Sequence, residues 1–497
     1  MSGVVEPSLE ASAGLEPADG AEASEKLAGS VRRGLGWSVV NTVTSRLGSL
    51  IAAMVLARLL TPQDYGAYAV ATVVLAAVLS FNELGVSLAI VRWPEDPAKI
   101  GPTVNTVSAL LSCLLFLGCT LSAPYLAALL NAPAATPMIR VVSVCVLIDG
   151  VTASSAAMIA RGLHQDRRFA ADLAGFLMGT VLSVVLAILG FGAWSMIWGL
   201  MMANVISAIT TLTLAPRRFG FGWDRDITRR LVRFGLPLAG SSLLLFVMLN
   251  VDYILVGHLA GAEALGLYLI AFNLASWPVN IISATVRRVS LAAFSRAAAD
   301  HVRLRSAFLR GLTLVLTAAL LICLPLGLLA HSVLRVLYGA QWTGAAQALG
   351  LLCVFSAGRI LAEYAYDYFI ASDRNHFNLI LQGVWLAALA PSLALGIRWA
   401  GINGAAAAQA LVVVVVVIPL LFAGLGGAIP WPDLLRAARR PLLTAFPPVV
   451  ACLLIGLVID QPLLLLLLGG AVTTLGYAIA NKDTLLDIRR SREAPVV

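Results

Sequence analysis

Charged side chains lie in the middle of long apolar segments of this sequence. Arg46 and Arg359 are each central in such a segment. Glu363 and Asp367 follow Arg359 at steps of four residues, which places one cation and two carboxylates on the same face of a helix. A charge at the centre of a bilayer costs about 2.5 to 3.5 kcal/mol on insertion scales, so each of these residues requires a partner or a function.

These residue types predict a water-filled cavity that binds an anion. A guanidinium group fits phosphate oxygens and stays charged when it is desolvated. Carboxylates in the same low-dielectric space can exchange protons during a transport cycle. The candidate anion-binding residues are Arg46, Arg58 and Arg359; the candidate titratable residues are Glu83, Asp149, Asp252, Glu363 and Asp367; and Thr42, Asn250 and Tyr366 are expected to line the cavity.

A purely structural interpretation of the same charges stays open. Arg359 and Glu363 can pair one helical turn apart and make their burial tolerable. Asn250 and Asp252 lie near the end of an apolar segment, where local polar packing accounts for them equally well. Arg58 can extend its guanidinium to the membrane interface.

The composition indicates that the elements holding these residues are membrane helices. Of 497 residues, 60% are hydrophobic and only 12% are charged, with a mean hydropathy of +0.90. Soluble proteins carry about 25% charged residues, so a soluble enzyme, a disordered chain and a nucleic-acid binder are excluded despite the net charge of +8. Runs such as LVVVVVVIPLLF do not alternate in polarity, which excludes a membrane barrel.

About fourteen apolar segments are long enough to span the bilayer. Basic residues concentrate in alternate connections, with six arginines within 215–233, so both termini are expected in the cytoplasm. The predicted spans are 34–60, 66–92, 101–123, 138–160, 171–191, 194–214, 234–259, 264–292, 307–330, 345–371, 377–397, 400–424, 442–460 and 463–480.

The sequence also repeats itself. Gly66 and Tyr68 match Gly266 and Tyr268 at a separation of 200 residues, although coincidence between two hydrophobic hairpins is an alternative explanation. Two halves of six spans each would enter the membrane in the same sense, related by a pseudo-twofold axis along the membrane normal. The predicted domains are a disordered cytoplasmic tail (1–30), an N-lobe (31–216), a basic cytoplasmic linker (217–233), a C-lobe (234–425), two extra helices (426–481) and a cytoplasmic tail (482–497).

Nothing in the motifs predicts an enzyme. The phosphate-binding loop of ATPases is missing from the sequence, and no nucleophile–base set stands out in the short loops. The six cysteines form no CxxC pair and the five histidines form no HExxH pair, so we expect neither a metal nor a cofactor. Transport is the predicted activity.

Two segments of the sequence resemble a known family. They are LARLLTPQDYGAYAVA (56–71), followed by Asn-Glu-Leu-Gly (82–85), and NVDYILVGHLAGAEALGLYLIAFNLA (250–275), followed by the segment 287–296. Both are similar to bacterial polysaccharide exporters, the Wzx-like lipid-linked oligosaccharide flippases of the multidrug/oligosaccharidyl-lipid/polysaccharide exporter superfamily. His258 and the stretch 291–293 depart from the family pattern.

The resemblance implies a two-lobed, V-shaped fold and a specific substrate. Family members move undecaprenyl-pyrophosphate-linked oligosaccharide from the inner to the outer leaflet of the bacterial cytoplasmic membrane, for capsule, exopolysaccharide or O-antigen synthesis. An ion gradient of protons or sodium would drive the step, with Glu83, Asp149, Asp252 or Glu363 as carriers. The implied partners are membrane lipids, a polysaccharide polymerase and glycosyltransferases, but no nucleic acid.

Two other functions stay open. A multidrug or toxin extruder of the same superfamily would share the fold, but its cavity is expected to be acidic, without central arginines. A non-transporting scaffold for polysaccharide assembly would use the buried charges for structure alone.

Overall fold

The computed structural model describes residues 48–82, 86–162, 164–217, 219–297, 300–426 and 429–484. The predictions for Thr42, Arg46 and Glu83 fall outside these residues. The described chain is helical and contains no strand, and eleven of its helices are long and apolar enough to cross a membrane. An all-helical chain satisfies its backbone hydrogen bonds internally, as a bilayer requires.

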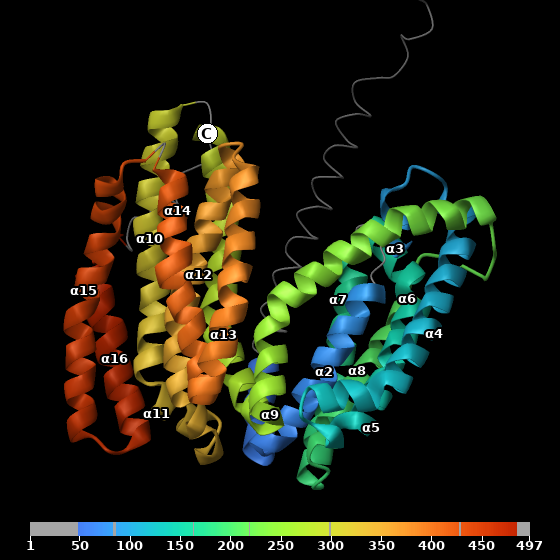
Figure 1. Ribbon diagram of the computed structural model, residues 1–497, viewed down its shortest axis with the longest axis horizontal. Helices are drawn as coiled ribbons and strands as arrows, with labels where there is room; N and C mark the ends of the chain where they lie inside the picture. The colour runs from blue at the N-terminus through green and yellow to red at the C-terminus, as the bar shows by residue number, and fades with distance from the viewer. Residues whose placement is uncertain are drawn as a thin grey trace, which may run out of the picture.

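The helices form two bundles that diverge toward the end at which α9 (Arg225–Ala297) begins (Figure 1). The first bundle contains the short helix Gly48–Leu59, α2 (Pro62–Asn82), α3 (Val86–Arg92), α4 (Pro97–Leu129), η1 (Pro133–Ala135), α5 (Thr136–Val142), α6 (Val144–Arg161), α7 (Gln165–Ile188) and α8 (Ala193–Leu214).

The second bundle follows the connecting helix α9 (Arg225–Ala297), which begins inside the predicted linker. Leu231 of α9 packs with Ile90 and Ile100 of the first bundle, whereas the later part of α9 packs on α12 and α13. The bundle contains α10 (His301–Leu328), α11 (Ala330–Leu337), η2 (Ala340–Ala345), α12 (Ala346–Ala371), α13 (Asn375–Val412), η3 (Val413–Val417), α14 (Ile418–Leu425), α15 (Trp431–Val458) and α16 (Pro462–Ala480).

Two of the eleven helices are each broken where the sequence predicts a loop between spans. The backbone of α9 is non-helical at Gly261, with φ 86°, and that of α13 is non-helical at Ala400 and Gly401. Both glycines have positive φ, a conformation that glycine adopts without a steric penalty. When these two breaks are counted, the number of spans comes close to the predicted fourteen.

The backbone of the two bundles repeats the same special geometry. Gly192, before α8, has φ 54° and ψ −136°, and Gly401, before the second part of α13, has φ 56° and ψ −134°. Asn131 and Gly339 also both have positive φ, and each precedes a short 3-10 turn that leads into a long helix. The predicted parallel repeat is therefore present in three dimensions.

Glycines allow the hairpin helices of each bundle to approach closely. A Cβ on Gly179 would lie 2.6 Å from the carbonyl oxygen of Gly199, and a Cβ on Gly404 would lie 1.8 Å from that of Gly396. Small residues at such contacts are typical of membrane helix packing, where van der Waals contact replaces the hydrophobic effect between helices.

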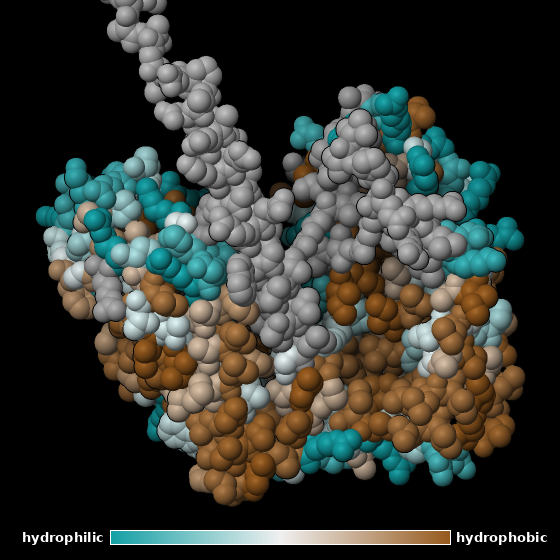
Figure 2. Space-filling view, turned by 180° about the vertical axis from the view of Figure 1, so that it is seen from behind, coloured by the Kyte–Doolittle hydropathy of each residue, from teal (hydrophilic) through white to brown (hydrophobic). Residues whose placement is uncertain are grey.

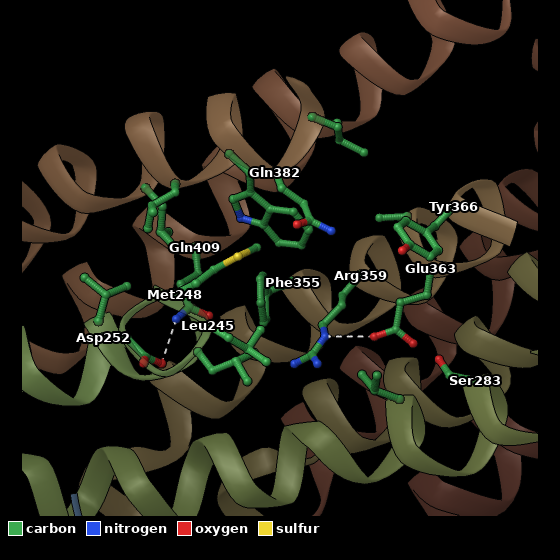
Figure 3. Close-up of a pocket in the computed structure, with 18 of the residues that line it drawn as sticks. Leu245, Met248, Asp252, Ser283, Phe355, Arg359, Glu363, Tyr366, Gln382 and Gln409 are labelled. Carbon is green, nitrogen blue, oxygen red and sulfur yellow. Dashed lines mark hydrogen bonds and ion pairs between the residues drawn. The ribbon is translucent and has the colours of Figure 1, made fainter. Parts of the chain in front are cut away.

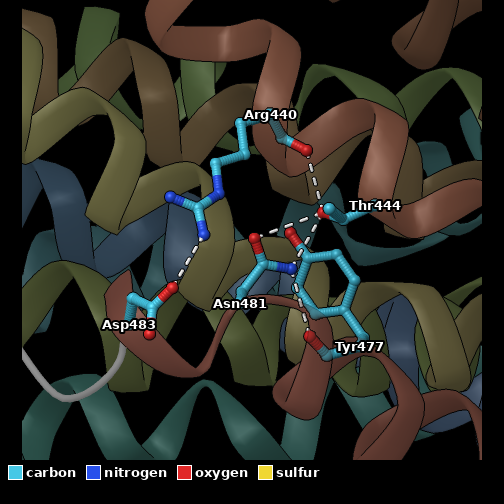
Figure 4. Close-up of polar contacts among 5 residues, drawn as sticks. All are labelled: Arg440, Thr444, Tyr477, Asn481 and Asp483. Atoms are coloured by element: carbon cyan, nitrogen blue, oxygen red, sulfur yellow. Dashed lines mark hydrogen bonds and ion pairs between the residues drawn. The ribbon is translucent and has the colours of Figure 1, made fainter.

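The last two helices form a separate hairpin beside α10 (Figure 1). A polar cluster joins their ends, where the Asn481 amide donates to Thr444 Oγ1 over 2.8 Å (Figure 4). The Tyr477 hydroxyl also donates to the carbonyl of Pro441 over 3.2 Å. Arg440 and Asp483 form an ion pair of 3.2 Å beside this cluster.

On the face shown in Figure 2, an apolar surface covers the middle of the molecule and lies between two polar ends. Large exposed apolar side chains from both bundles contribute to it, among them Leu121, Leu244 and Leu467. Such a band is what a chain needs to lie in hydrocarbon, and the structure agrees with the composition in making this a multi-pass membrane protein.

Candidate functional site

A cavity of about 620 Å³ opens within the second bundle between α9, α12 and α13 (Figure 3). Four residues singled out from the sequence line it together: Asp252 from α9, and Arg359, Glu363 and Tyr366 from α12. Phe272, Phe355 and Trp385 supply aromatic walls between them. The cavity therefore combines apolar walls with a few charged groups, as small-molecule sites do.

Arg359 and Glu363 form an ion pair inside this cavity. Arg359 Nε lies 3.1 Å from Glu363 Oε1, one helical turn along α12 (Figure 3). Both side chains stay partly exposed, at 31% and 28%. The pair is thus accessible from the cavity, and the guanidinium has donors to spare because it carries five N–H groups.

Asp252 lies on the side of the cavity away from Glu363 (Figure 3). It is buried, and its carboxylate accepts hydrogen bonds from uncharged donors. Its Oδ2 accepts hydrogen bonds from the Tyr268 hydroxyl over 3.1 Å and from Gln409 Nε2 over 2.9 Å. Gln409 Nε2 also donates to the Tyr268 hydroxyl over 2.8 Å, which closes a triangle. Within the described part of the chain Asp252 has no ion pair, so it can gain a proton without breaking one.

Asp367 and Asn250 face other partners. Asp367 is buried, accepts a 2.6 Å hydrogen bond from Ser290 Oγ, and lies 3.7 Å from Arg287 Nε. Asn250 is half-buried and donates to the carbonyl of Phe246 on its own helix over 2.9 Å. The structure therefore gives Asp367 an arginine partner and gives Asn250 a local one.

Asp149 lies in a second cavity of about 680 Å³, inside the first bundle. Its lining is rich in small and polar residues from α6, α7 and α8, including Thr152, Asn204 and Ser207. Arg168 and Asp172 lie 3.9 Å apart at the same cavity. Each bundle thus carries one polar cavity.

Arg58 lines neither cavity. Its guanidinium is exposed and donates to the carbonyl oxygens of Val336 and Leu337 at the end of α11, with Nε 3.1 Å from the Leu337 oxygen. The structure therefore separates Arg58 from Arg359, with which the sequence grouped it.

The structure adds site residues that sequence reasoning missed. Arg287, Gln382 and Gln409 all line the cavity of the second bundle. Gln409 could have been found from the sequence, because it is a polar side chain within a long apolar run (GAAAAQALVVVVVV). The prediction considered mainly charged side chains and therefore did not include this amide. Arg287 is the first residue of the segment 287–296, which resembles the exporter family, but the sequence alone predicted no role for it.

Solved structures with the same fold are membrane transporters. The inward closed form of the lipid II flippase MurJ matches 91% of this chain and 100% of its own, with a TM-score of 0.72 and 14% sequence identity. An inward-facing multidrug resistance MATE transporter matches 76% of this chain and 94% of its own, with a TM-score of 0.59 and 17% identity. The chain thus shares the fold of these two structures, in agreement with the predicted fold class.

The sequence comparisons give the family. Residues 55–347 match the family described as Polysaccharide biosynthesis protein, and the chain belongs to it. The succinoglycan biosynthesis transport protein ExoT of Rhizobium meliloti is 27% identical over 65% of this chain and just under two thirds of its own, 66%. The lipopolysaccharide biosynthesis protein WzxC of Escherichia coli is 22% identical over 75% of this chain and 76% of its own. The predicted kinship with Wzx-like exporters is confirmed, and the chain is a multi-pass membrane protein of the polysaccharide biosynthesis family.

Proposed function

We propose that this protein moves undecaprenyl-pyrophosphate-linked oligosaccharide across the bacterial cytoplasmic membrane by alternating access, with both termini in the cytoplasm. The observation that carries the proposal is the partly exposed Arg359–Glu363 pair in a cavity at membrane depth. A buried pair without access to the cavity would serve structure only, whereas an accessible guanidinium can exchange its carboxylate for a phosphate oxygen.

The substrate pyrophosphate and Glu363 compete for Arg359 in this mechanism. The anion displaces the carboxylate from the guanidinium when it enters the cavity, and the carboxylate returns when the anion leaves. The ion pair keeps the empty cavity from holding an isolated charge, which would be costly in a low-dielectric space. The proposal also keeps two predictions from the sequence. Arg46 takes part in binding the anion, and a basic cytoplasmic linker joins the N-lobe to the C-lobe.

Asp252 is the proposed carrier of the coupling ion. Its contacts with Tyr268 and Gln409 are uncharged, so protonation or sodium binding neutralises a buried charge without releasing an arginine. Asp367 and Glu363 are less suited to this role, because each pairs with an arginine, and neutralising the carboxylate would leave that guanidinium without its partner. Asp149 is the corresponding candidate in the first bundle.

Replacing Arg359 with alanine tests the proposal. The variant is expected to insert normally and to export no surface polysaccharide, with lipid-linked intermediates accumulating on the cytoplasmic side. Arg310→Ala is the control. Arg310 is exposed, and among the described residues its side chain forms hydrogen bonds only with Ser306, one turn earlier in the same helix. Normal surface polysaccharide in Arg359→Ala would refute the cationic site.

The same variant, Arg359→Ala, distinguishes the proposed glycan transport from drug extrusion. If Arg359→Ala alters the accumulation of cationic drugs and leaves polysaccharide export intact, the chain is a multidrug extruder instead.

A further inference from the structure

The two bundles touch at the end of the molecule opposite to the start of α9, where α2 and η2 both meet α9 (Figure 1). Here the last turn of the helix Gly48–Leu59 meets the end of α11 and the start of η2. Arg58 donates to the carbonyls of Val336 and Leu337, and Gln341 Nε2 donates to the carbonyl of Ala57 over 2.9 Å. The Trp342 indole, which is fully buried, donates to the same Ala57 oxygen over 2.8 Å.

A second contact repeats the first with the bundles exchanged. His258, at the end of the first part of α9, places Nδ1 2.5 Å from the carbonyl oxygen of Leu129 at the end of α4. The carbonyl of His258 in turn accepts a hydrogen bond from Asn131 Nδ2. With the proton on Nδ1, the imidazole is the donor to Leu129.

The two contacts are related by the internal repeat. Arg58 and His258 are separated by 200 residues, the separation of Gly66 from Gly266, and Leu129 and Leu337 are separated by 208, the separation of Asn131 from Gly339. In each contact, a basic side chain at the end of the first helix of one bundle reaches the carbonyl of the last residue of a helix in the other bundle, α11 for Arg58 and α4 for His258. The reciprocal pattern is what a twofold axis between the bundles requires.

Helix ends make these carbonyls suitable partners. The last four carbonyl groups of an α-helix have no intrahelical donor, and they carry the negative end of the helix dipole. Leu129 is the last residue of α4 and Leu337 the last residue of α11. A basic side chain from the other bundle satisfies such a carbonyl while the bundles touch, and water satisfies both groups when the bundles part.

We infer that Arg58 and His258 are the two latches of a gate at this end of the transporter, which is the outer end when the basic linker at the start of α9 faces the cytoplasm. The latches close the gate while the cavities are open toward the opposite end, and they exchange with water when the cycle reverses. This inference rests on the proposed alternating-access function. It assigns Arg58 to the gate instead of the substrate cavity, and it gives a role to His258, a departure from the family pattern.

An accessibility measurement tests the gate independently of the substrate. Gln382, which lines the cavity of the second bundle, is replaced by cysteine in a variant whose six native cysteines are serine or alanine. A membrane-impermeant maleimide is then added to intact cells. The double variant Arg58→Ala, His258→Ala is expected to raise labelling from outside by about tenfold, because removing charge-assisted hydrogen bonds shifts a two-state equilibrium by that order.

The control is Arg335→Ala. Arg335 is an exposed basic residue in the last turn of α11, at the same end of the molecule, and is not part of either latch. Its substitution is expected to leave labelling unchanged. Labelling after permeabilisation gives the total reactive protein, so that a poorly folded variant is recognised by its lower total.

Cross-linking gives a second measurement. Cysteines in place of Arg58 and Val336, joined by a bifunctional methanethiosulfonate about as long as the arginine side chain, are expected to hold the gate closed and stop export, and a reductant is expected to restore it. Unchanged external labelling in the double alanine variant, with full labelling after permeabilisation, overturns the gate. If the double variant shows increased labelling but the parent protein itself exports no glycan, the gate is kept and the proposed substrate is refuted.

Discussion

Gly66 and Gly266 lie against each other's helix at the contact between α2 and α9. A Cβ on Gly66 would lie 1.8 Å from the carbonyl oxygen of Ala262, and a Cβ on Gly266 would lie 2.1 Å from that of Pro62. Each glycine thus packs against the residue four positions before the other glycine. Gly66 and Gly266, which match in the sequence repeat, therefore also lie at one helix–helix contact. Because the contact is reciprocal, a twofold axis that relates the two bundles passes through it.

Gly66→Ala is expected to destabilise this contact. Its methyl group would collide with backbone atoms, which cannot rotate away as a flexible side chain can, so α2 and α9 must separate. Overpacking of this kind costs about 1 to 3 kcal/mol. Thermal unfolding of the purified protein in detergent measures the loss. Gly240→Ala is the matched control, since no atom lies within 4 Å of its Cβ position apart from its chain neighbours and the backbone of its own helix; equal effects of the two substitutions would contradict the explanation.

Exchanging the charges of Arg359 and Glu363 is expected to preserve insertion and abolish polysaccharide export. The ion pair survives the exchange, but the guanidinium moves by about one helical turn, roughly 5.4 Å, away from the position that meets the phosphate. The amount of protein in the membrane and the surface polysaccharide are the two measurements. A scaffold that needs only the pair would export normally after the exchange.

Asp252→Asn is expected to uncouple transport from the ion gradient. The amide keeps the size of the carboxyl group and loses its charge, so neither a proton nor a sodium ion is carried. Reconstituted vesicles with and without an imposed gradient show the effect: the variant should move substrate at the same slow rate in both. Asp460→Asn, on the exposed turn between α15 and α16, should respond to the gradient as the parent does. A gradient response in Asp252→Asn would assign coupling to another residue.

Asn481→Ala is expected to loosen the α15–α16 hairpin and leave the rest of the fold intact. The fully buried Asn481 joins Thr444 and the carbonyl of Tyr477, and leaving these groups unpaired costs about 1 to 3 kcal/mol (Figure 4). Hydrogen exchange should therefore accelerate within 441–481 and stay unchanged in α2. Thr474→Ala provides the comparison, because its hydroxyl bonds only within its own helix.

The apolar periodicity and the charge of the loops determined most of the fold. They predicted helical spans, their approximate limits and a parallel repeat, because a bilayer accepts few structures and penalises each exposed backbone group. The connections predicted within α9 and α13 are not separate loops: each is a short break in a long helix, at Gly261 and at Ala400 and Gly401. In the second bundle the same penalty on buried charge singled out Asp252, Arg359 and Glu363, which the structure brings to one cavity.

Pairing between distant segments was decided by the tertiary structure alone. The sequence grouped Arg58 with Arg359 as like charges in apolar surroundings, yet their surroundings differ: one meets the end of α11 and the other a carboxylate on its own helix. Gln409 reaches Asp252 across 157 residues, and no local pattern encodes that contact. Burial cost depends on residue type and is therefore legible in the sequence, whereas the partner that offsets it depends on how the helices pack.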